Sequence, residues 1–401
     1  MAEPPTSAER ARNERVEATS PEATSPGATA PEVTVGPIAH GGHCIARHEG
    51  RVIFVRHALP GERVRLRITD TSQDRFWRAD AIEVLEAAPD RVRPDCPVSG
   101  PGGCGGCDFQ HVSDSGELEL KRSVVAEQLA RLAGIDWTGA VEAVPPVRNW
   151  RHRMRYLADA DGEPALRAHR SHELIRIPDD GCPIASVDPC ALGVPEVAEQ
   201  TSLTVVDAAE EQLLLVGDAD ESVVEEAAGR RFEVQGQGFW QVHPAAVDTL
   251  VTAVLEGLRP AAGERAFDLY CGVGVFAGAL ADAGVTVWGV ESDKPAISHA
   301  RRNVREAKFS SGRVDRVLPK LPRRTDLVVL DPPRAGAGRK VLEQVIAREP
   351  RAIAYVACDP AALARDLAYA AELGYTPDSI RAFNLFPRTH HIEAVAILTP
   401  N

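Results

Sequence analysis

The sequence Ala266–Phe276, AFDLYCGVGVF, decides the fold class of this protein. An apolar run that carries one acid, Asp268, breaks into Gly272 and Gly274, and a helical pattern follows at once. Glycine lets a ligand approach the backbone, and the first amides of a helix are free to bind it. The stretch predicts a strand, a ligand-binding turn and a helix. It has two of the three glycines of the dinucleotide-binding pattern, so it needs support from the residues downstream.

Strand-like and helix-like segments alternate from about residue 236 onward, which is typical of a parallel sheet with helices on both faces. The strand near 285–290 ends in Glu291, about twenty residues after the turn, where an acid hydrogen-bonds ribose hydroxyls in nucleotide-binding sheets. These two features alone also fit a Rossmann dehydrogenase. We expect the strands at 266–270, 285–290, 325–330 and 353–357, with a closing pair near 381–386 and 392–398.

Three side chains at later strand ends point to chemistry over the same crevice. The strand near 330 runs into DPPR, Asp331 to Arg334, where two prolines make the loop rigid. Cys358 stands directly before a helix, whose dipole can stabilise a thiolate, so we favour a nucleophile over a buried structural cysteine. Glu393 opens the last strand and can reach the crevice as a general base.

Charge is distributed unevenly along the chain. The net charge of −13 argues against nucleic-acid binding, but residues 36–78 hold eight Arg and four acids, whereas residues 196–226 hold ten acids and no Lys or Arg. Local charge decides binding, so RNA stays a possible partner. No apolar run approaches the length of a membrane span, and eight cysteines, several spaced like ligands, fit a reducing compartment. We expect a cytoplasmic monomer without membrane contact.

The first ninety residues divide into two segments. Residues 1–32 are rich in Ala, Pro, Glu, Ser and Thr and predict a disordered tail. Residues 33–92 contain short β-rich runs, which predict a small β-barrel. The alternation in Val64–Ile68 gives this barrel one apolar face and one arginine face, for which RNA binding and simple solvation remain open.

Residues 93–235 form the next segment and hold a second basic region. Between Arg148 and Arg176, seven Arg alternate with aromatic residues that include Trp150 and Tyr156. Arginine for phosphates and aromatic rings for stacking are typical of a single-stranded RNA surface. The alternative is a solvated strand face.

The same segment contains clustered cysteines. Cys96, Cys104 and Cys107 lie close together, the last two as C-x2-C in a glycine-rich loop. Cys182 and Cys190 are the candidates for a fourth thiolate. By spacing alone a structural zinc is the commoner occupant, and an iron–sulfur cluster also takes four thiolates.

Two resemblances sharpen this interpretation. The segment GPIAHGGHCIARHEGRVIFVRHALPGERVRLRI, residues 36–68, resembles a TRAM domain, an OB-like RNA-binding barrel. The chain from about residue 33 to the end resembles the class I S-adenosylmethionine-dependent RNA 5-methyluridine methyltransferases, which include 23S rRNA and tRNA uracil-C5 enzymes. The resemblance implies an α/β protein with a TRAM barrel at 33–92, a central α+β RNA-binding domain at 93–235 and a Rossmann-like methyltransferase domain at 236–401.

The resemblance also implies a role for each matching residue. Cys358 matches the nucleophile and Glu393 the base. The positions that bind the methyl donor are Gln241, Tyr270, Glu291 and Asp331. In the iron–sulfur members the last ligand stands in a Cys-Pro pair, which Cys182 matches and Cys190 does not. A [4Fe-4S] cluster is therefore implied in place of zinc, on Cys96, Cys104, Cys107 and Cys182.

The chain departs from the family pattern beside two of these positions. His243 replaces the usual Asn two residues after Gln241, and Asp359 replaces the Asn that usually follows the nucleophile. A carboxylate beside Cys358 would raise the pKa of the thiol and so oppose its ionisation.

The implied reaction is methyl transfer to C5 of a uridine. Cys358 adds to C6, C5 takes the methyl group of S-adenosylmethionine, and Glu393 removes the C5 proton from a uridine extruded from its stack. Arg334 stands where amine methyltransferases have an aromatic residue, and DPPR lacks the cysteine of cytosine-C5 enzymes. By analogy the TRAM domain and cysteines favour 23S rRNA. The alternatives are a tRNA uracil-C5 methyltransferase and a catalytically silent RNA-binding iron–sulfur protein.

Overall fold

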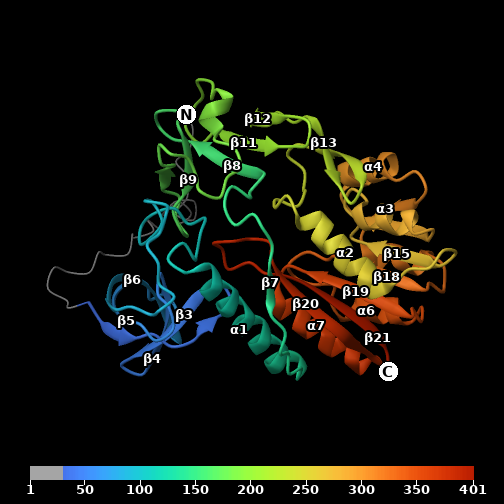
Figure 1. The fold of residues 1–401 in the computed structure, drawn as a ribbon, viewed down its shortest axis with the longest axis horizontal. Coiled ribbons are helices and arrows are strands. Elements are labelled where there is room, and N and C mark those ends of the chain that lie inside the picture. Colours follow the sequence, from blue (N-terminus) through green and yellow to red (C-terminus); the bar gives the residue numbers. More distant parts are fainter. Residues whose placement is uncertain (1–29) are drawn as a thin grey trace, which may run out of the picture.

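The computed structural model describes residues 30–401, whose strands form four sheets (Figure 1). The tail expected at residues 1–32 lies almost entirely outside this range. Within it, no helix is both long and apolar enough to cross a membrane.

The N-terminal strands form one six-stranded sheet in the segment where a small β-barrel is expected. Its spatial order is β1 (Glu32–Thr34), β5 (Arg63–Asp70), β6 (Phe76–Glu86), β4 (Arg51–Arg56), β3 (His43–His48) and β2 (Ile38–Ala39). In β5, Val64 and Leu66 are fully buried and the arginines between them face outward, as the alternation predicts. Cys44 is buried in β3 and its thiol donates to the carbonyl of Ala58, so it belongs to the core of this sheet.

The central segment contains two smaller sheets. The five-stranded one has the order β10 (Leu174–Arg176), β9 (Pro164–Arg167), β8 (Arg153–Ala158), β11 (Ser202–Asp207) and β12 (Gln212–Val216); a hairpin follows, of β13 (Ser222–Ala227) and β14 (Arg230–Gln235). Trp150 and Tyr156 are fully buried here, so their interpretation as base-stacking residues is wrong. Arg153 is also buried and forms an ion pair with Glu225. Arginine and aromatic residues alternate between Arg148 and Arg176 because half of these side chains face a core.

An eight-stranded sheet forms the C-terminal part of the protein. Its order is β17 (Lys308–Ser311), β16 (Thr286–Glu291), β15 (Arg265–Leu269), β18 (Leu327–Leu330), β19 (Ala352–Ala357), β21 (Glu393–Pro400), β20 (Tyr375–Asn384) and β7 (Val141–Ala143). The first five strands are parallel, and β21 runs antiparallel to both of its neighbours, β19 and β20. The expected order of strands from the glycine turn to the closing pair is therefore present, with β17 as a further edge strand.

Helices cover both faces of this sheet. Along β19, Ile353 and Tyr355 face one core while Ala354 and Val356 face the other. Helices α2 (Ala246–Leu258) and α3 (Val275–Asp282) lie on the second side, and α6 (Arg339–Ile346) and α7 (Pro360–Glu372) on the first. The remaining helices of this part are α4 (Lys294–Asn303), α5 (Val314–Val317) and the short 3-10 turn η3 (Leu318–Lys320); another 3-10 turn, η2 (Pro189–Leu192), belongs to the central segment.

One helix and one strand from the central segment belong to the catalytic sheet. Helix α1 (Asp114–Ala133) packs on α7, and β7 pairs in parallel with β20. In Figure 1, α1 lies between the N-terminal sheet and the red C-terminal strands. A boundary at residue 235 therefore does not separate two folding units. The sequence does not predict that α1 and β7 pack with the C-terminal sheet, because β7 has only three residues and α1 buries polar side chains, including Glu117 and Lys121.

Candidate active site

The crevice lies where the strand order reverses, between β15 and β18. Chain connections run in opposite directions from this point, so the carboxyl ends of the strands leave room for a ligand. After β15, Tyr270 adopts φ 68°, a left-handed conformation that a bulky residue rarely takes, and Gly274 follows with φ 95°. Fully buried Asp268 accepts a hydrogen bond from the amide of Ala277 at 2.8 Å. This bond ties the turn to the start of α3.

Four acidic side chains gather at these strand ends: Asp268, Glu291, Asp331 and Glu393. Burial, followed by the charges of Asp331 and Glu291, raises the pKa of Asp268 to about 8. Burial, followed by the charge of Glu291, raises the pKa of Asp331 to about 7. Carboxylates that destabilise one another in this way favour a cationic ligand, because its charge would stabilise their ionised forms.

Glu291 occupies the position expected of a ribose-binding acid. Its carboxylate accepts hydrogen bonds from the amide of Gly272 at 3.2 Å and from the amide of Asp293 at 2.7 Å. The acid therefore holds the glycine turn from the neighbouring strand.

Cys358 and Glu393 face one another across two strands. Ala357 pairs with Ala394. This register places Cys358, the residue after β19, opposite Glu393, the first residue of β21. Burial raises the pKa of Cys358 to about 11, with Glu393 and Asp331 adding to the shift and Arg334 opposing it. Burial likewise holds the pKa of Glu393 well above its usual range. The two candidate catalytic groups are thus close enough for the charge of Glu393 to oppose ionisation of Cys358.

The DPPR loop is shaped by a residue that sequence reasoning missed. Fully buried Asp366 in α7 accepts hydrogen bonds from the Tyr355 hydroxyl at 2.6 Å and from the Gly338 amide at 3.0 Å. A shallow depression lies between this loop and Cys358. Asp366 sits inside a helix pattern, so only the fold reveals its role.

The loop that leads to Glu393 is held by residues from the N-terminal half. Asp108 accepts hydrogen bonds from the amide of His390 at 3.0 Å and from its ring Nδ1 at 2.6 Å. The carboxylate of Glu117 accepts from the amide of Arg388, and Lys121 donates to Asn384 at 2.6 Å. The cysteine-rich loop and α1 therefore position the strand that carries the candidate base.

Gln241, the remaining residue expected to bind the methyl donor, stands in the segment before α2. It is half-buried before α2, and among residues 30–401 no hydrogen bond joins it to Tyr270, Glu291 or Asp331. His243 is buried, stacks on Trp150 with ring centroids 6.0 Å apart and has Nε2 3.0 Å from the Pro146 carbonyl. His243 thus packs beneath the segment that carries Gln241.

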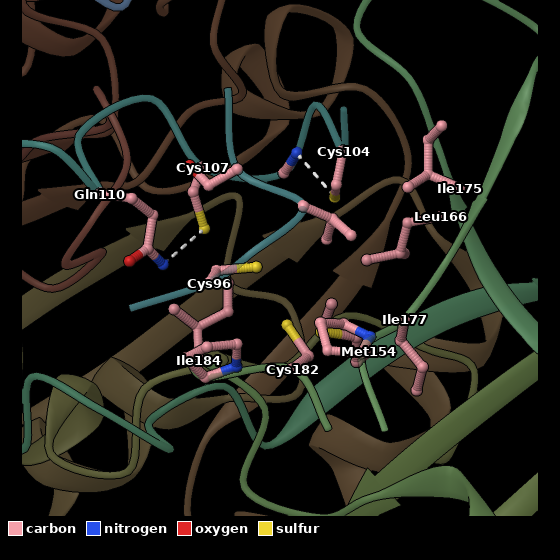
Figure 2. Close-up of a pocket in the computed structure, with 15 residues that line it drawn as sticks. Cys96, Cys104, Cys107, Gln110, Met154, Leu166, Ile175, Ile177, Cys182 and Ile184 are labelled. Atoms are coloured by element: carbon pink, nitrogen blue, oxygen red, sulfur yellow. Dashed lines mark hydrogen bonds between the residues drawn. The ribbon is translucent and has the colours of Figure 1, made fainter. Parts of the chain in front are cut away.

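The clustered cysteines surround one cavity. Figure 2 shows Cys96, Cys104, Cys107 and Cys182 on its wall, together with Met154, Leu166 and three isoleucines. The volume of this cavity is about 20 Å³. Cys190 is exposed in η2 and does not line it. The structure therefore gathers the four cysteines that the sequence analysis selected.

Among the described residues, no three His, Cys, Asp or Glu side chains lie close enough to share a single ion. Two sulfurs accept hydrogen bonds, Cys104 from the Gly106 amide at 3.4 Å and Cys107 from Gln110 at 3.5 Å.

The arginine face of the N-terminal sheet is largely neutralised. Arg63, Arg65 and Arg67 form ion pairs with Glu32, Glu83, Glu86 and Asp80.

A different surface of this sheet combines arginine with aromatic rings. Arg78 lies over Phe76 at 5.3 Å and over Phe54 at 5.9 Å, and His43 packs edge-on to Phe54 and 6.2 Å from His169 of the central segment. Sequence alternation points to the first surface and gives no signal for the second, because β4 and β6 come together only in the fold.

Comparison with known proteins assigns these parts to families. The sequence profile of the TRAM domain matches residues 30–82, that of tRNA (uracil-5-)-methyltransferases matches 323–400, and that of the methyltransferase small domain matches 244–354. An RNA methyltransferase of Streptomyces avermitilis is 46% identical over 427 residues, covering 91% of this chain and 97% of its own. The chain belongs to the RNA methyltransferase family.

Further relatives agree with this assignment. RNA methyltransferases of Streptomyces coelicolor and Bifidobacterium longum are 46% and 36% identical, covering 91% and 90% of this enzyme and 92% and 94% of their own chains. Among solved structures, the tRNA (uracil-54, C5)-methyltransferase of Pyrococcus abyssi, in complex with S-adenosyl-L-homocysteine, superposes with a TM-score of 0.70 at 24% identity. It covers 91% of this chain and 99% of its own, so the two share the whole fold.

Proposed function

We propose that this enzyme transfers a methyl group from S-adenosylmethionine to C5 of a uridine in RNA, with 23S rRNA as its substrate. The observation that carries the proposal is the pair formed by Cys358 and Glu393 at adjacent strand ends, above an acidic crevice. A soft nucleophile beside a carboxylate is the combination that substitution at C5 of uracil requires, since C5 itself is a weak nucleophile.

Each of the two residues has a defined part in the reaction. The Cys358 thiolate forms a bond to C6 of uridine, and the electron pair of the C5–C6 double bond becomes available at C5. Bound S-adenosylmethionine supplies an electrophilic methyl group on a positively charged sulfur. The electron pair at C5 would bond to this methyl carbon as the methyl–sulfur bond breaks, and its electrons would stay on the sulfur of the neutral thioether product. Glu393, as a carboxylate, then takes the proton from the methylated C5. The C5–C6 double bond reforms as the C6–S bond breaks, which returns the Cys358 thiolate.

The acidic crevice supplies the site for the donor. Glu291 stands where an acid binds ribose hydroxyls, and Asp331 and Tyr270 flank the same turn. The cationic sulfonium would stabilise the ionised forms of Asp268 and Asp331, whose pKa values burial raises. Gln241 would complete the site from the segment before α2.

The four cavity cysteines, Cys96, Cys104, Cys107 and Cys182, would hold a [4Fe-4S] cluster. The apolar wall and the hydrogen bonds to sulfur support this occupant. The cavity touches neither Cys358 nor the acidic crevice, and no step of the reaction needs an electron. The cluster would therefore serve folding: it would fix the loop whose Asp108 holds His390.

RNA would bind over the aromatic–arginine surface of Phe54, Phe76 and Arg78. Aromatic rings stack on unpaired bases and arginine binds phosphate, as a uridine extruded from its stack requires. The surface continues to His169 of the central segment, so both N-terminal segments would contact the substrate.

Methylation of defined RNA pools tests the proposal. The purified enzyme is incubated with labelled S-adenosylmethionine and, separately, with unmodified rRNA and tRNA; the labelled nucleoside is identified by mass spectrometry. Label in 5-methyluridine of 23S rRNA is the expected result. Label in tRNA would favour the second candidate, a tRNA uracil-C5 methyltransferase, which the match at residues 323–400 also supports. Label in another nucleoside, or none, would contradict the proposed chemistry.

A further inference from the structure

A loop of the TRAM sheet reaches the candidate nucleophile. In the turn between β2 and β3, His40 Nε2 lies 3.1 Å from Oδ2 of Asp359, the residue after Cys358. Gly42 in the same turn lies so close to His390 that an added Cβ would stand 2.7 Å from His390 Cβ. A single N-terminal loop thus touches both the segment that carries Cys358 and the segment that leads to Glu393.

Asp359 has two hydrogen-bond partners on opposite sides. Oδ1 accepts from the Ala362 amide at 2.8 Å and caps the N-terminus of α7, while Oδ2 faces His40. Burial opposes ionisation of this carboxyl, but the bonds from His40 and the α7 amides outweigh it and hold its pKa below the ordinary value. Asp359 is therefore a carboxylate at neutral pH, at the position where the resembling enzymes have a neutral Asn.

The surroundings of Cys358 already disfavour its thiolate form. Burial and the carboxylates of Glu393 and Asp331 already oppose the thiolate, which Arg334 and a backbone hydrogen bond favour. A third carboxylate turned toward the sulfur would oppose it further. The direction in which Asp359 points, and the group that holds it there, therefore bear on the reactivity of Cys358.

We propose that His40 is a positioning residue of the active site, which holds the Asp359 carboxylate against the TRAM loop and away from Cys358. The inference rests on the proposed role of Cys358 as the nucleophile. Side chains of His40 and Asp359 are 39% and 24% exposed, so the pair contributes little to stability and acts through the placement of charge. The TRAM domain thus takes part in the chemistry as well as in RNA binding.

A double-mutant cycle tests this role in the full-length protein. The variants are His40→Ala, Asp359→Asn and the two combined. Alkylation of Cys358 by iodoacetamide, without RNA or donor, is followed by peptide mass spectrometry across pH 7 to 9, and kcat and KM are measured with RNA. We expect His40→Ala to slow alkylation and lower kcat by about tenfold, equivalent to one pKa unit at the thiol. KM for RNA should change less.

The decisive result is the effect of His40→Ala when residue 359 is Asn. With no carboxylate to hold, removal of His40 should leave alkylation and kcat as they are in Asp359→Asn alone. An equal loss in both backgrounds would mean that His40 only docks the TRAM domain, and would overturn the proposal. So would normal alkylation in His40→Ala. The matched control is His48→Ala, a TRAM histidine whose 3.9 Å neighbour, Glu49, is on the exposed surface.

Failure of this inference is distinguishable from failure of the proposed function. If Cys358→Ala still transferred methyl groups, the nucleophile itself would be wrong. If Cys358→Ala were inactive while His40→Ala behaved as the unmodified enzyme does, only the role of His40 would be wrong.

Discussion

Cys358 and the four cavity cysteines lie in two very different environments. Cys358 stands at a strand end among ionisable groups, with Glu393, Asp331 and Arg334 all acting on its charge. The four cavity cysteines face mainly apolar side chains such as Met154 and the isoleucines, with hydrogen bonds from Gly106 and Gln110 (Figure 2). Burial raises the pKa in both places, but carboxylates add to the shift at Cys358, whereas the charged neighbours of Cys104 and Cys182 are the arginines Arg56 and Arg151.

This difference separates a reactive thiol from a structural one. A nucleophile needs access and neighbours that can shift its ionisation during the reaction. A ligand needs partners that stay fixed and a surround that excludes water. We therefore expect substitution of Cys358 to remove activity and spare the fold, and substitution in the cavity to do the reverse.

The largest effect should come from Cys358→Ala. Without the thiolate, C6 of uridine is not attacked and C5 stays unreactive, so kcat should fall by on the order of 10⁴-fold or more. The thermal unfolding midpoint should stay close to that of the unmodified enzyme. Measurable turnover in this variant would place the nucleophile elsewhere.

Glu393→Gln should lower the rate by about 10²- to 10⁴-fold and leave a distinctive product. Cys358 can still add to the base, but the proton at C5 has no acceptor, so the adduct cannot resolve. A protein–RNA complex that survives a denaturing gel should accumulate, and it should be absent from the double variant with Cys358→Ala. Loss of activity without any such complex would indicate that Glu393 acts before methyl transfer.

Cys104→Ala should lower the stability of the fold and have a smaller effect on methyl transfer. Loss of a ligand should lower the bound iron per protein and reduce the unfolding midpoint by more than about 5 °C, because cluster binding is coupled to folding. Cys190→Ala, an exposed cysteine outside the cavity, is the matched control. Equal iron content in the two variants would show that the cavity does not hold the cluster.

The pH profile of kcat/KM should report the ionisation of Cys358. Its pKa is raised to about 11, so the thiolate is the minor form at neutral pH and its fraction grows as pH rises. Ionisation of Glu393, whose pKa is also raised, changes the rate in the same direction. We expect kcat/KM to rise by about tenfold per pH unit in the neutral to mildly alkaline range. A profile that falls as pH increases would contradict this assignment.

Arg78→Ala should have the smallest effect, confined to RNA binding. Removal of one phosphate contact should weaken affinity and reduce the slope of log K against log salt by about one, with kcat little changed. Arg65→Ala is the control, since Arg65 is already paired with Glu32 and Glu83. Equal losses in both variants would mean that the paired face also meets RNA.

The residues around the crevice could be predicted from the sequence because each of them belongs to a local pattern. The glycine turn after β15, the acid ending β16, DPPR and Cys358 each stand at the end of an apolar run, and parallel strands bring such ends together. Spacing marked Cys96, Cys104 and Cys107 and left Cys182 and Cys190 open, and the Cys-Pro pair of the resembling family favoured Cys182.

Contacts between distant segments gave no such signal. Asp108 and His390 are 282 residues apart, and neither stands in a periodic pattern. His40 lies in a glycine turn of the TRAM sheet, where only the assembled fold reveals Asp359 as its neighbour. Buried polar side chains hid another contact. Glu117 and Lys121 form an ion pair inside the protein, so the apolar face of α1 is not recognisable from the sequence pattern.

The parallel pair of β7 and β20 has a consequence for synthesis of the chain. Val141 pairs with Ala382, so a strand translated early must wait for a partner translated late. At about 5–20 residues per second, the delay is roughly 10 to 50 s. During that interval the buried face of α1 has no α7 to cover it, because the two helices pack together only in the finished fold. The nascent chain must therefore keep an apolar helix face from aggregating on the ribosome until its last residues emerge.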